Sequence, residues 1–369
     1  MSNELLLETI EVSKRFGEFV ALKSANIEVR AGKVLGFVGS NGAGKSTLIR
    51  VITGAHAPSS GTVKVRGKVV EKADPALMRS LGIACIYQHS SLVSTLSVID
   101  NIFLGRQIRN RFGLVNGKAQ RKRLQEVMTQ FEITVDPDEE VGRLTPVSQK
   151  EVEILKALVA SADVILMDEP TAWLSLSEVK TLHTTIRKLS AAGKGVVYIS
   201  HVLDEVFEIC DDITILRDGT MIWTGPEADI DRPKLVNLMV GEALGEASRA
   251  AMTAERHPRG NREVRLATKG LTKNDVFHDI SFEAYAGEIL CFAGLIGSRR
   301  SEVVKCLFGD DKPNSGEILS EGKAIRFKSP SAAIASGICL VPEDRHAEGL
   351  CLQHSTLENI VIPSLETLS

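Results

Sequence analysis

Residues 39–47, GSNGAGKST, match the spacing Gly-x-x-x-x-Gly-Lys-Ser/Thr of a phosphate-binding loop. Glycines let backbone N–H groups face a ligand, and together with the start of a following helix these groups form a cradle for anions. We expect Lys45 to reach the β- and γ-phosphates of a nucleotide, Ser46 to ligate Mg²⁺, and Thr47 to add a phosphate contact. A chance glycine-rich turn is the alternative, but the apolar run before the loop and the helical pattern after it favour a phosphate loop. The predicted nucleotide-binding residues of this loop are Gly39, Ser40, Asn41, Gly42, Ala43, Gly44, Lys45, Ser46 and Thr47.

Acidic and polar residues follow three other apolar runs. In VILMDEP, Asp168 is expected to hold the Mg²⁺ shell and Glu169 to polarise the attacking water as a general base. His201, after GVVYIS, can touch the γ-phosphate and hold both the water and Glu169. Gln88, at the end of IACIYQ, can sense Mg²⁺ and the water. The sequence therefore predicts Glu169, His201 and Gln88 as catalytic residues, and Ser46, Gln88 and Asp168 as metal ligands.

Each of these residues also has a plain structural interpretation. An Asp-Glu pair at a strand end is often turn chemistry, and a single histidine is more often structural. The presence of the phosphate loop and the order of the motifs favour the functional interpretation. Phe16, in SKRFGEFVAL, is predicted to lay its ring against adenine, although a core position is an alternative role for it.

The elements that must position these residues are short buried strands. KVLGFVG enters the phosphate loop, KSTLIRVITG continues from it as a helix, and DVILMDEP and GVVYISH are two more apolar runs with polar ends. Strands of this kind alternating with helices indicate a mainly parallel α/β sheet. Ligands bind such sheets at the carboxyl ends of the strands, where the polar residues stand.

A second loop, GLIGSRRSE at residues 294–302, keeps the first glycine but carries Arg299 and Arg300 where glycine and lysine are expected. It lies 255 residues after the first loop. The same offset relates Gly32 to Gly287, Gly42 to Gly297, Gly54 to Gly309, Pro58 to Pro313, Gly61 to Gly316, Gly67 to Gly322 and Gly82 to Gly337. This repetition indicates two copies of one module, at residues 1–240 and 264–369, with a linker at residues 241–263. The second copy is roughly 130 residues shorter than the first.

Composition narrows the function classes. The hydrophobic content of 43% and the mean hydropathy of +0.04 are those of an ordinary globular protein, and a net charge of −3 gives no support for nucleic acid as a partner. A basic stretch over residues 106–123 is interpreted as a solvated surface. The six cysteines are scattered along the sequence, and we interpret them as small buried apolar residues of a protein in a reducing compartment. The N-terminus is a poor signal peptide and no apolar run reaches 18 residues, so a membrane role is expected to come through a partner.

The order of Phe16, GSNGAGKST, Gln88, VILMDEP and His201 resembles that of ABC-type ATPases. The altered second loop and the segments GLIGSRRSEVVKCLFG, VPEDRHAEGL, EVEILKAL and YISHVLDEVFEICDDITILRDG resemble the bacterial monosaccharide-import ATPases of the ribose/galactose/xylose group. The resemblance covers nearly the whole chain. It implies an α/β P-loop NTPase fold with a mainly parallel sheet and a helical subdomain, in a tandem repeat whose second copy is incomplete.

The same resemblance implies a function and partners. The chain is expected to be an ATPase, with ATP and Mg²⁺ as cofactors, that energises import of a monosaccharide. Membrane permease subunits would be its direct partners, and a periplasmic or extracellular sugar-binding protein an indirect one. The expected location is the cytoplasmic face of the cell membrane, as a peripheral protein.

The family signature Leu-Ser-x-Gly-Gln, which grips the nucleotide of the opposite module, is altered here. Residues 144–148 read LTPVS, so Val147 replaces the glycine and adds bulk, while Pro146 has no N–H to donate. This poor signature would face the poor loop at Arg299 and Arg300, leaving one hydrolytic site at the first loop. Its signature is expected beyond Ser369, and a second ATPase half could supply it. The chain alone is therefore expected to bind Mg-ATP but to hydrolyse it poorly.

Three other functions compete with monosaccharide import. The cargo could be a nucleoside or another small polar solute, because an import ATPase does not touch the solute. The chain could be an inactive or regulatory remnant of a transporter, given the short second copy and Val147. A soluble ABC protein acting on ribosomes or DNA is disfavoured, since such proteins generally keep two intact loops.

Overall fold

The computed structural model of the chain describes residues 4–88, 90–172, 174–241, 262–294, 297–342 and 345–364. These residues form two compact units, one before and one after residues 242–261. The predicted linker at residues 241–263 lies almost entirely outside the described residues.

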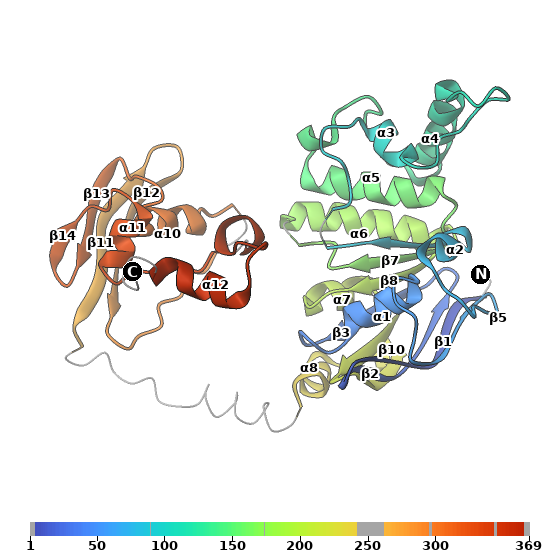
Figure 1. The fold of residues 1–369 in the computed structure, drawn as a ribbon, viewed down its shortest axis with the longest axis horizontal. Helices are drawn as coiled ribbons and strands as arrows, with labels where there is room; N and C mark the ends of the chain where they lie inside the picture. Colours follow the sequence, from blue (N-terminus) through green and yellow to red (C-terminus); the bar gives the residue numbers. More distant parts are fainter. Residues whose placement is uncertain are drawn as a thin grey trace. The chain divides into compact units, whose positions relative to one another are not determined.

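The first unit is built on one mixed sheet (Figure 1). Its strand order is β5-β4-β1-β2-β10-β9-β3-β8-β7-β6. The strands are β1 Leu5–Phe16, β2 Phe19–Arg30, β3 Val34–Gly39, β4 Ser60–Val65, β5 Lys68–Val69, β6 Ile83–Ile86, β7 Val164–Asp168, β8 Gly195–Ile199, β9 Asp212–Arg217 and β10 Thr220–Pro226.

Five neighbouring strands of this sheet run parallel. β3 pairs with β8 and with β9, β7 pairs with β8, and β6 pairs with β7, all in parallel register. All six residues of β3 are buried, as expected for a parallel strand covered on both faces. The three strands predicted from apolar runs are therefore confirmed, and the carboxyl ends of β3, β6, β7 and β8 meet at one edge of the sheet.

Helices cover both faces of the sheet and extend beyond its β6–β7 edge (Figure 1). α3, α4 and α5 pack against one another at that end, and α5 also contacts α6. They are α1 Lys45–Ile52, α2 Pro75–Ser80, α3 Val98–Phe103, α4 Gly117–Phe131, α5 Pro146–Val159, α6 Leu176–Ala191, α7 Leu203–Ile209 and α8 Arg232–Val240, with short 3₁₀ turns at Val141–Arg143 and Glu227–Asp229.

Local sequence explains where the long helices begin. Thr145 caps α5 by accepting from the backbone N–H of Ser148, and a proline occupies the first turn. Ser175 and Glu178 form a capping box at the start of α6. Two buried apolar clusters then fix the helices on the sheet, one containing α3 to α6 and the other packing β1, β2 and α1.

The second unit repeats part of the first. Its sheet has the order β12-β11-β13-β14, which corresponds to β2-β1-β4-β5. The strands are β11 Val264–Lys273, β12 Phe277–Tyr285, β13 Ser315–Ser320 and β14 Lys323–Ile325, and the helices are α10 Arg300–Phe308, α11 Pro330–Ala335 and α12 Thr356–Val361, with short helical turns at Arg345–Gly349 and Ile362–Ser364. α10 and α11 begin 255 residues after α1 and α2, in agreement with the repeat read from the sequence.

Candidate nucleotide-binding site

The phosphate loop and the predicted catalytic residues line one cavity. Its volume is about 670 Å³, and it opens at the shared carboxyl edge of β3, β6, β7 and β8. Its walls contain the whole loop 39–47 together with Gln88, Asp168, Glu169 and His201. Parallel pairing explains this convergence, because each polar residue follows the end of a strand in the same register.

The carboxylate of Glu169 is held from two sides. Gln88 Nε2 donates to Glu169 Oε2 over 3.0 Å, and His201 Nδ1 lies 3.0 Å from Glu169 Oε1. The backbone of Glu169 has a φ of +46°, an uncommon conformation for a residue with a side chain, and its N–H donates to Ile199 O at the end of β8. This backbone conformation and these contacts hold the carboxylate between Gln88 and His201, as a general base for water requires.

Lys45 is buried in its own loop. Its Nζ donates to the carbonyl oxygens of Gly39 (2.6 Å) and Ser40 (3.0 Å). Burial lowers the pKa of Lys45, while the nearby carboxylates of Glu169 and Asp168 act in the opposite direction. An ammonium group with only neutral carbonyl partners can bind incoming phosphate oxygens strongly.

The phosphate loop requires glycine at two positions where its backbone comes close to neighbouring strands. A Cβ at Gly39 would lie 2.3 Å from the carbonyl oxygen of Leu216 on β9. At Gly44, where φ is +108°, a Cβ would lie 2.7 Å from the carbonyl oxygen of Ala21. The loop backbone therefore lies close against β2 and β9, where a side chain would clash, and glycine allows this close approach.

The oxygen groups present fit Mg²⁺. Ser46, Gln88 and Asp168 line the same cavity and offer hydroxyl, amide and carboxylate oxygens. Burial, followed by the nearby Glu169 carboxylate, raises the pKa of Asp168, and a cation beside it would offset that cost. No group of three or more His, Cys, Asp or Glu within the described residues could hold a metal by itself.

Comparison with known proteins identifies the family. The model of the ABC transporter family matches residues 22–172. The ribose import ATP-binding protein of Rubrobacter xylanophilus is 42% identical over 96% of this chain and 70% of its own length. The chain belongs to the ABC transporter family of ATP-binding proteins.

Other relatives agree with this assignment. A putative ribose/galactose/methyl galactoside import ATP-binding protein of Agrobacterium fabrum is 40% identical over 99% of this chain and 71% of its own length. A nucleotide-free ATP-binding cassette from an ABC transporter superposes with a TM-score of 0.55 at 28% identity, over 64% of this chain and all of that one. A cassette in its ADP conformation gives 0.57 at 26% identity, over 66% and 98%. The predicted P-loop ATPase fold is thereby confirmed.

Phe16 lies outside the residues that line the cavity of this ABC cassette, whereas Phe19 lies among them. The two rings belong to strands that pair at Phe16 and Phe19. Phe16 is 44% exposed. Its ring packs edge-on against His56, with 5.4 Å between the ring centroids, and its centroid lies 5.1 Å from Lys14 Nζ. Stacking of Phe16 on adenine stays a prediction, and Phe19 is a second aromatic side chain that the sequence analysis did not single out.

A buried carboxylate behind the site was also missed. Glu205 on α7 accepts hydrogen bonds at its Oε2 from Thr171 (2.9 Å), Tyr198 (2.8 Å) and Ser200 (2.9 Å). Thr171 follows Glu169 by two residues, and Ser200 precedes His201. Glu205 therefore ties together the two turns that carry the candidate catalytic residues. The only sequence signal was an acidic residue on the buried side of a short helix.

The described residues 297–300 of the second loop keep a backbone like that of the first loop, with different side chains. Arg299 precedes α10 with a φ of +66°, at the position where Gly44 precedes α1. A left-handed conformation is costly for arginine, and here its guanidinium pairs with Glu302 at 3.0 Å. Arg300 takes the position of Lys45. The altered loop is thus folded as a helix-start turn, with bulky cations where the intact loop has glycine and lysine.

The LTPVS segment starts α5 but leaves few groups for a nucleotide. The Thr145 hydroxyl is already bonded to Ser148. It accepts from the Ser148 backbone N–H over 3.3 Å and donates to Ser148 Oγ over 3.0 Å. Pro146 offers no N–H, and the side chain of Val147 packs against the buried core. These contacts support the interpretation of residues 144–148 as a poor signature.

Proposed function

We propose that this chain is the ATP-binding and ATP-hydrolysing subunit that energises import of a monosaccharide through an ABC transporter. The observation that carries the proposal is the convergence of Gln88 and His201 on Glu169, above an intact phosphate loop in one cavity. The names of the relatives, which are ribose and galactose import proteins, supply the class of cargo.

Each residue has a role in this proposal. The loop N–H groups and Lys45 bind and orient the triphosphate. Mg²⁺, when bound beside Ser46 and Asp168, would neutralise phosphate charge. Glu169 accepts the proton of the attacking water, Gln88 keeps that carboxylate in place and senses the metal, and His201 lies where it can hold both Glu169 and the water.

We further propose that hydrolysis by this chain alone is slow. The first unit offers a phosphate loop and a general base, but the nucleotide also needs a signature helix from another module. The LTPVS segment is a weak candidate, because Thr145 caps its own helix and Pro146 lacks an N–H. A second ATPase half that brings an intact signature is the partner this proposal requires.

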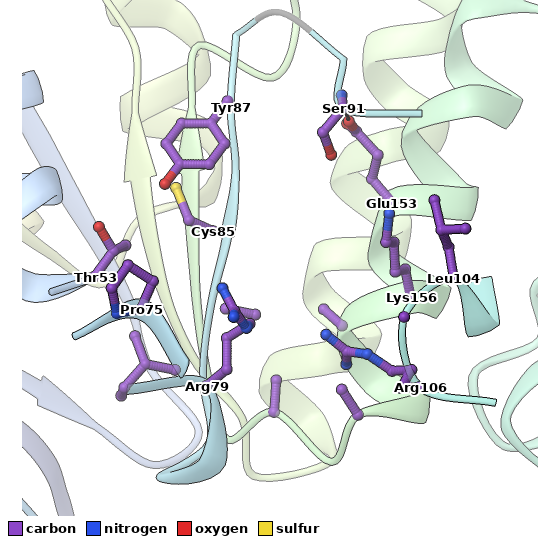
Figure 2. Close-up of a pocket in the computed structure, with 16 residues that line it drawn as sticks. Thr53, Pro75, Arg79, Cys85, Tyr87, Ser91, Leu104, Arg106, Glu153 and Lys156 are labelled. Carbon is purple, nitrogen blue, oxygen red and sulfur yellow. Dashed lines mark hydrogen bonds between the residues drawn. The ribbon is translucent and has the colours of Figure 1, made fainter. Parts of the chain in front are cut away.

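A groove on the first unit is the proposed contact for a membrane permease. It has a volume of about 440 Å³ and lies between β6 with α2 on one wall and α5 with residues 104–106 on the other (Figure 2). Its floor is apolar, with Ile83, Ala84 and Ala157 among its residues. Tyr87 lines the groove and directly precedes Gln88. A permease element bound in the groove could therefore transmit its movement to the nucleotide-binding site.

The positive charge of this groove indicates which kind of permease segment would bind there. Arg79 stands on one wall and Arg106 and Lys156 on the other (Figure 2). None of the three has an ion-pair partner in the part of the chain that the structure describes. Burial and then Arg79 lower the pKa of Arg106, and burial and then Arg106 lower that of Lys156. The one lining carboxylate, Glu153, is already bound to Lys150 at 3.0 Å. A permease segment with an acidic side chain would relieve this repulsion.

The proposed location of this chain follows from the membrane permease as its partner. No helix among the described residues is long and apolar enough to cross a membrane. We propose a peripheral position at the cytoplasmic face, where ATP is present and where the permease would expose its acidic segment to the groove.

The test is uptake of radiolabelled ribose, galactose or xylose by proteoliposomes that contain this chain, a second ATPase half with an intact signature, the permease that copurifies with them, and a sugar-binding protein. Uptake of one of these sugars should require enclosed Mg-ATP and disappear in Glu169→Gln, while ATP binding persists. Arg106→Glu should weaken permease binding without changing ATP affinity. ATP-driven uptake of nucleosides without any sugar, or uptake that Glu169→Gln leaves unchanged, would contradict the proposal.

A further inference from the structure

The connection between α3 and α4 in the first unit exposes a cluster of apolar side chains. Phe112 is 73% exposed, Leu114 is 65% exposed and Val115 is 52% exposed. In Figure 1 this connection projects from the end of the first unit that carries α3 and α4. Single exposed apolar residues are ordinary, but three within four consecutive residues on a projecting segment indicate contact with another molecule.

The backbone of this connection forms a hairpin that is closed by its own hydrogen bonds. Arg109 and Val115 face each other in an antiparallel bridge, and the Asn110 backbone N–H donates to Leu114 O over 2.8 Å. The side-chain oxygen of Asn110 accepts from the backbone N–H groups of Phe112 (2.9 Å) and Leu114 (3.1 Å). These bonds satisfy the backbone of the turn, so the hairpin is ordered while its apolar side chains stay in contact with water.

The charged residues around this apolar cluster all have the same sign. Between Asp100 and Glu126 the sequence contains no acidic residue. Arg121 pairs with Asp138 at 2.7 Å, and Arg123 lies 3.8 Å from Glu126. The basic residues of this stretch are Arg106, Arg109, Arg111, Lys118, Arg121, Lys122 and Arg123.

Two of these cations, Arg111 and Lys118, flank the apolar cluster and are exposed. Within the described part of the chain, neither lies within ion-pair distance of a carboxylate. The Arg111 guanidinium lies 4.8 Å from the centroid of the Phe112 ring. The hairpin thus presents apolar groups with positive charge beside them. A membrane interface offers the complementary pattern, because its acyl chains lie directly below anionic headgroups.

The hairpin also begins beside the groove proposed for the permease. Leu104, Gly105 and Arg106 line that groove, and Ile108, two residues further along the chain, packs against the buried core. The hairpin is therefore anchored to the same wall that the permease would contact. A permease bound in the groove would hold this end of the first unit toward the membrane.

We infer that the hairpin of residues 108–116 binds the surface of a bilayer that contains anionic lipids. Phe112 and Leu114 enter the boundary between headgroups and acyl chains, and Arg111 and Lys118 bind headgroup phosphates. A lipid surface fits a projecting tip better than a folded protein does, because a bilayer adapts to an inserted group, whereas a protein would need a matching cavity with acidic walls. This inference deepens the proposed function and rests on it for the location of the chain at a membrane.

Binding to protein-free vesicles tests the inference without permease or ATP. The full chain is mixed with vesicles of phosphatidylcholine that contain about one-third phosphatidylglycerol, or with vesicles of phosphatidylcholine alone, and the bound fraction is measured by flotation. The chain should bind the anionic vesicles about tenfold or more tightly than the neutral ones. This binding should weaken as the salt concentration rises, because salt screens the attraction of Arg111 and Lys118 to the headgroups.

Serine variants test the apolar part of the contact. Phe112→Ser combined with Leu114→Ser should weaken binding to anionic vesicles about tenfold or more, because both side chains leave water on insertion. Val115→Ser should weaken it about threefold. Val69→Ser on β5 is the matched control, because Val69 is 51% exposed against 52% for Val115, and it should bind like wild type. All four side chains are exposed, so thermal unfolding and ATP affinity should not change.

Glutamine variants test the charged part. Arg111→Gln combined with Lys118→Gln should weaken binding to anionic vesicles about tenfold or more. Lys68→Gln combined with Lys72→Gln removes the same charge from another exposed place and should change binding less than about twofold. Insertion itself is measured with Phe112→Trp, whose fluorescence should be quenched by lipids brominated on their acyl chains, beyond any quenching seen in wild type.

The inference is overturned if wild type does not distinguish anionic from neutral vesicles, if the double serine variant binds like wild type, or if brominated lipids leave the Phe112→Trp fluorescence unchanged. Loss of permease binding in detergent by the double serine variant, with vesicle binding intact, would assign the hairpin to the permease instead. Sugar uptake separates the two proposals. Uptake by wild type without vesicle binding defeats this inference alone, whereas vesicle binding without ATP-dependent uptake defeats the proposed function.

Discussion

At the scale of single residues, the site depends on how firmly Glu169 is held. Its φ of +46° is maintained by a backbone bond to Ile199, and its carboxylate lies between Gln88 and His201. Such local strain is sustained by the surroundings, and here the turns on either side are tied to the buried carboxylate of Glu205. Residues that never touch the nucleotide therefore matter for the geometry of those that do.

Replacing Glu205 with alanine should destabilise the chain. The change leaves the hydroxyls of Thr171, Tyr198 and Ser200 without their acceptor, at a cost of about 2 kcal/mol in the free energy of unfolding. Tyr198→Phe, which removes one donor and leaves the carboxylate paired, should cost about 1 kcal/mol. Urea unfolding measures both, and a Glu205→Ala chain as stable as wild type would show that the network is incidental.

Phe16 should contribute to binding of the base and not of the phosphates. Phe16→Ala is expected to weaken Mg-ATP binding by about tenfold, a typical loss for one stacked ring, and to leave tripolyphosphate binding unchanged. Phe19→Ala is the comparison, because the Phe19 ring lines the cavity. If titration calorimetry shows the tenfold loss in Phe19→Ala and none in Phe16→Ala, the role belongs to Phe19.

Cys85 lines the groove proposed for the permease, and the pH dependence of its alkylation rate reports its burial there. Burial raises the pKa of its thiol to about 12, so only about one molecule in ten thousand carries the thiolate at pH 8. Because the thiolate is the reactive form, alkylation of Cys85 should keep rising about tenfold per pH unit up to pH 10. Peptide-resolved alkylation rates provide the measurement, and a plateau for Cys85 near pH 8.5 would refute the burial.

At the scale of elements, the parallel strands position the chemistry, and the glycine loop must approach them closely. Gly39→Ala should cost more than about 2 kcal/mol and abolish ATP binding, because the added Cβ would lie 2.3 Å from a backbone oxygen of β9. Gly67→Ala is the control, with a φ of +77° and nothing within 4 Å, and should cost about 1 kcal/mol. Thermal unfolding measures the stability of both variants, and ATP titration measures their binding. Equal results for the two variants would contradict the close packing of the loop against β9.

The sequence was informative where local patterns determine an element. β3, β7 and β8 were predicted because each is a short apolar run with a polar end, and the phosphate loop because its spacing is specific. The sheet order was not predictable from such runs, since it depends on which strands pair across long separations. Glu205 was missed for the same reason. Its network arises where α7 packs on the sheet, and no local pattern encodes that packing.

At the scale of the whole molecule, one complete cassette is joined to a second unit that reproduces one edge of the same sheet. The altered loop at Arg299 and Arg300 belongs to that second unit. We therefore propose that nucleotide binding belongs to the first unit, whose loop keeps Gly44 and Lys45.

Titration calorimetry with Mg-ATP on the intact chain tests this division most directly. The account predicts one ATP per chain, loss of binding in Lys45→Ala, whose ammonium lies inside the loop, and no change in Arg300→Ala. Two ATP molecules per chain, or binding that survives Lys45→Ala and disappears in Arg300→Ala, would contradict it.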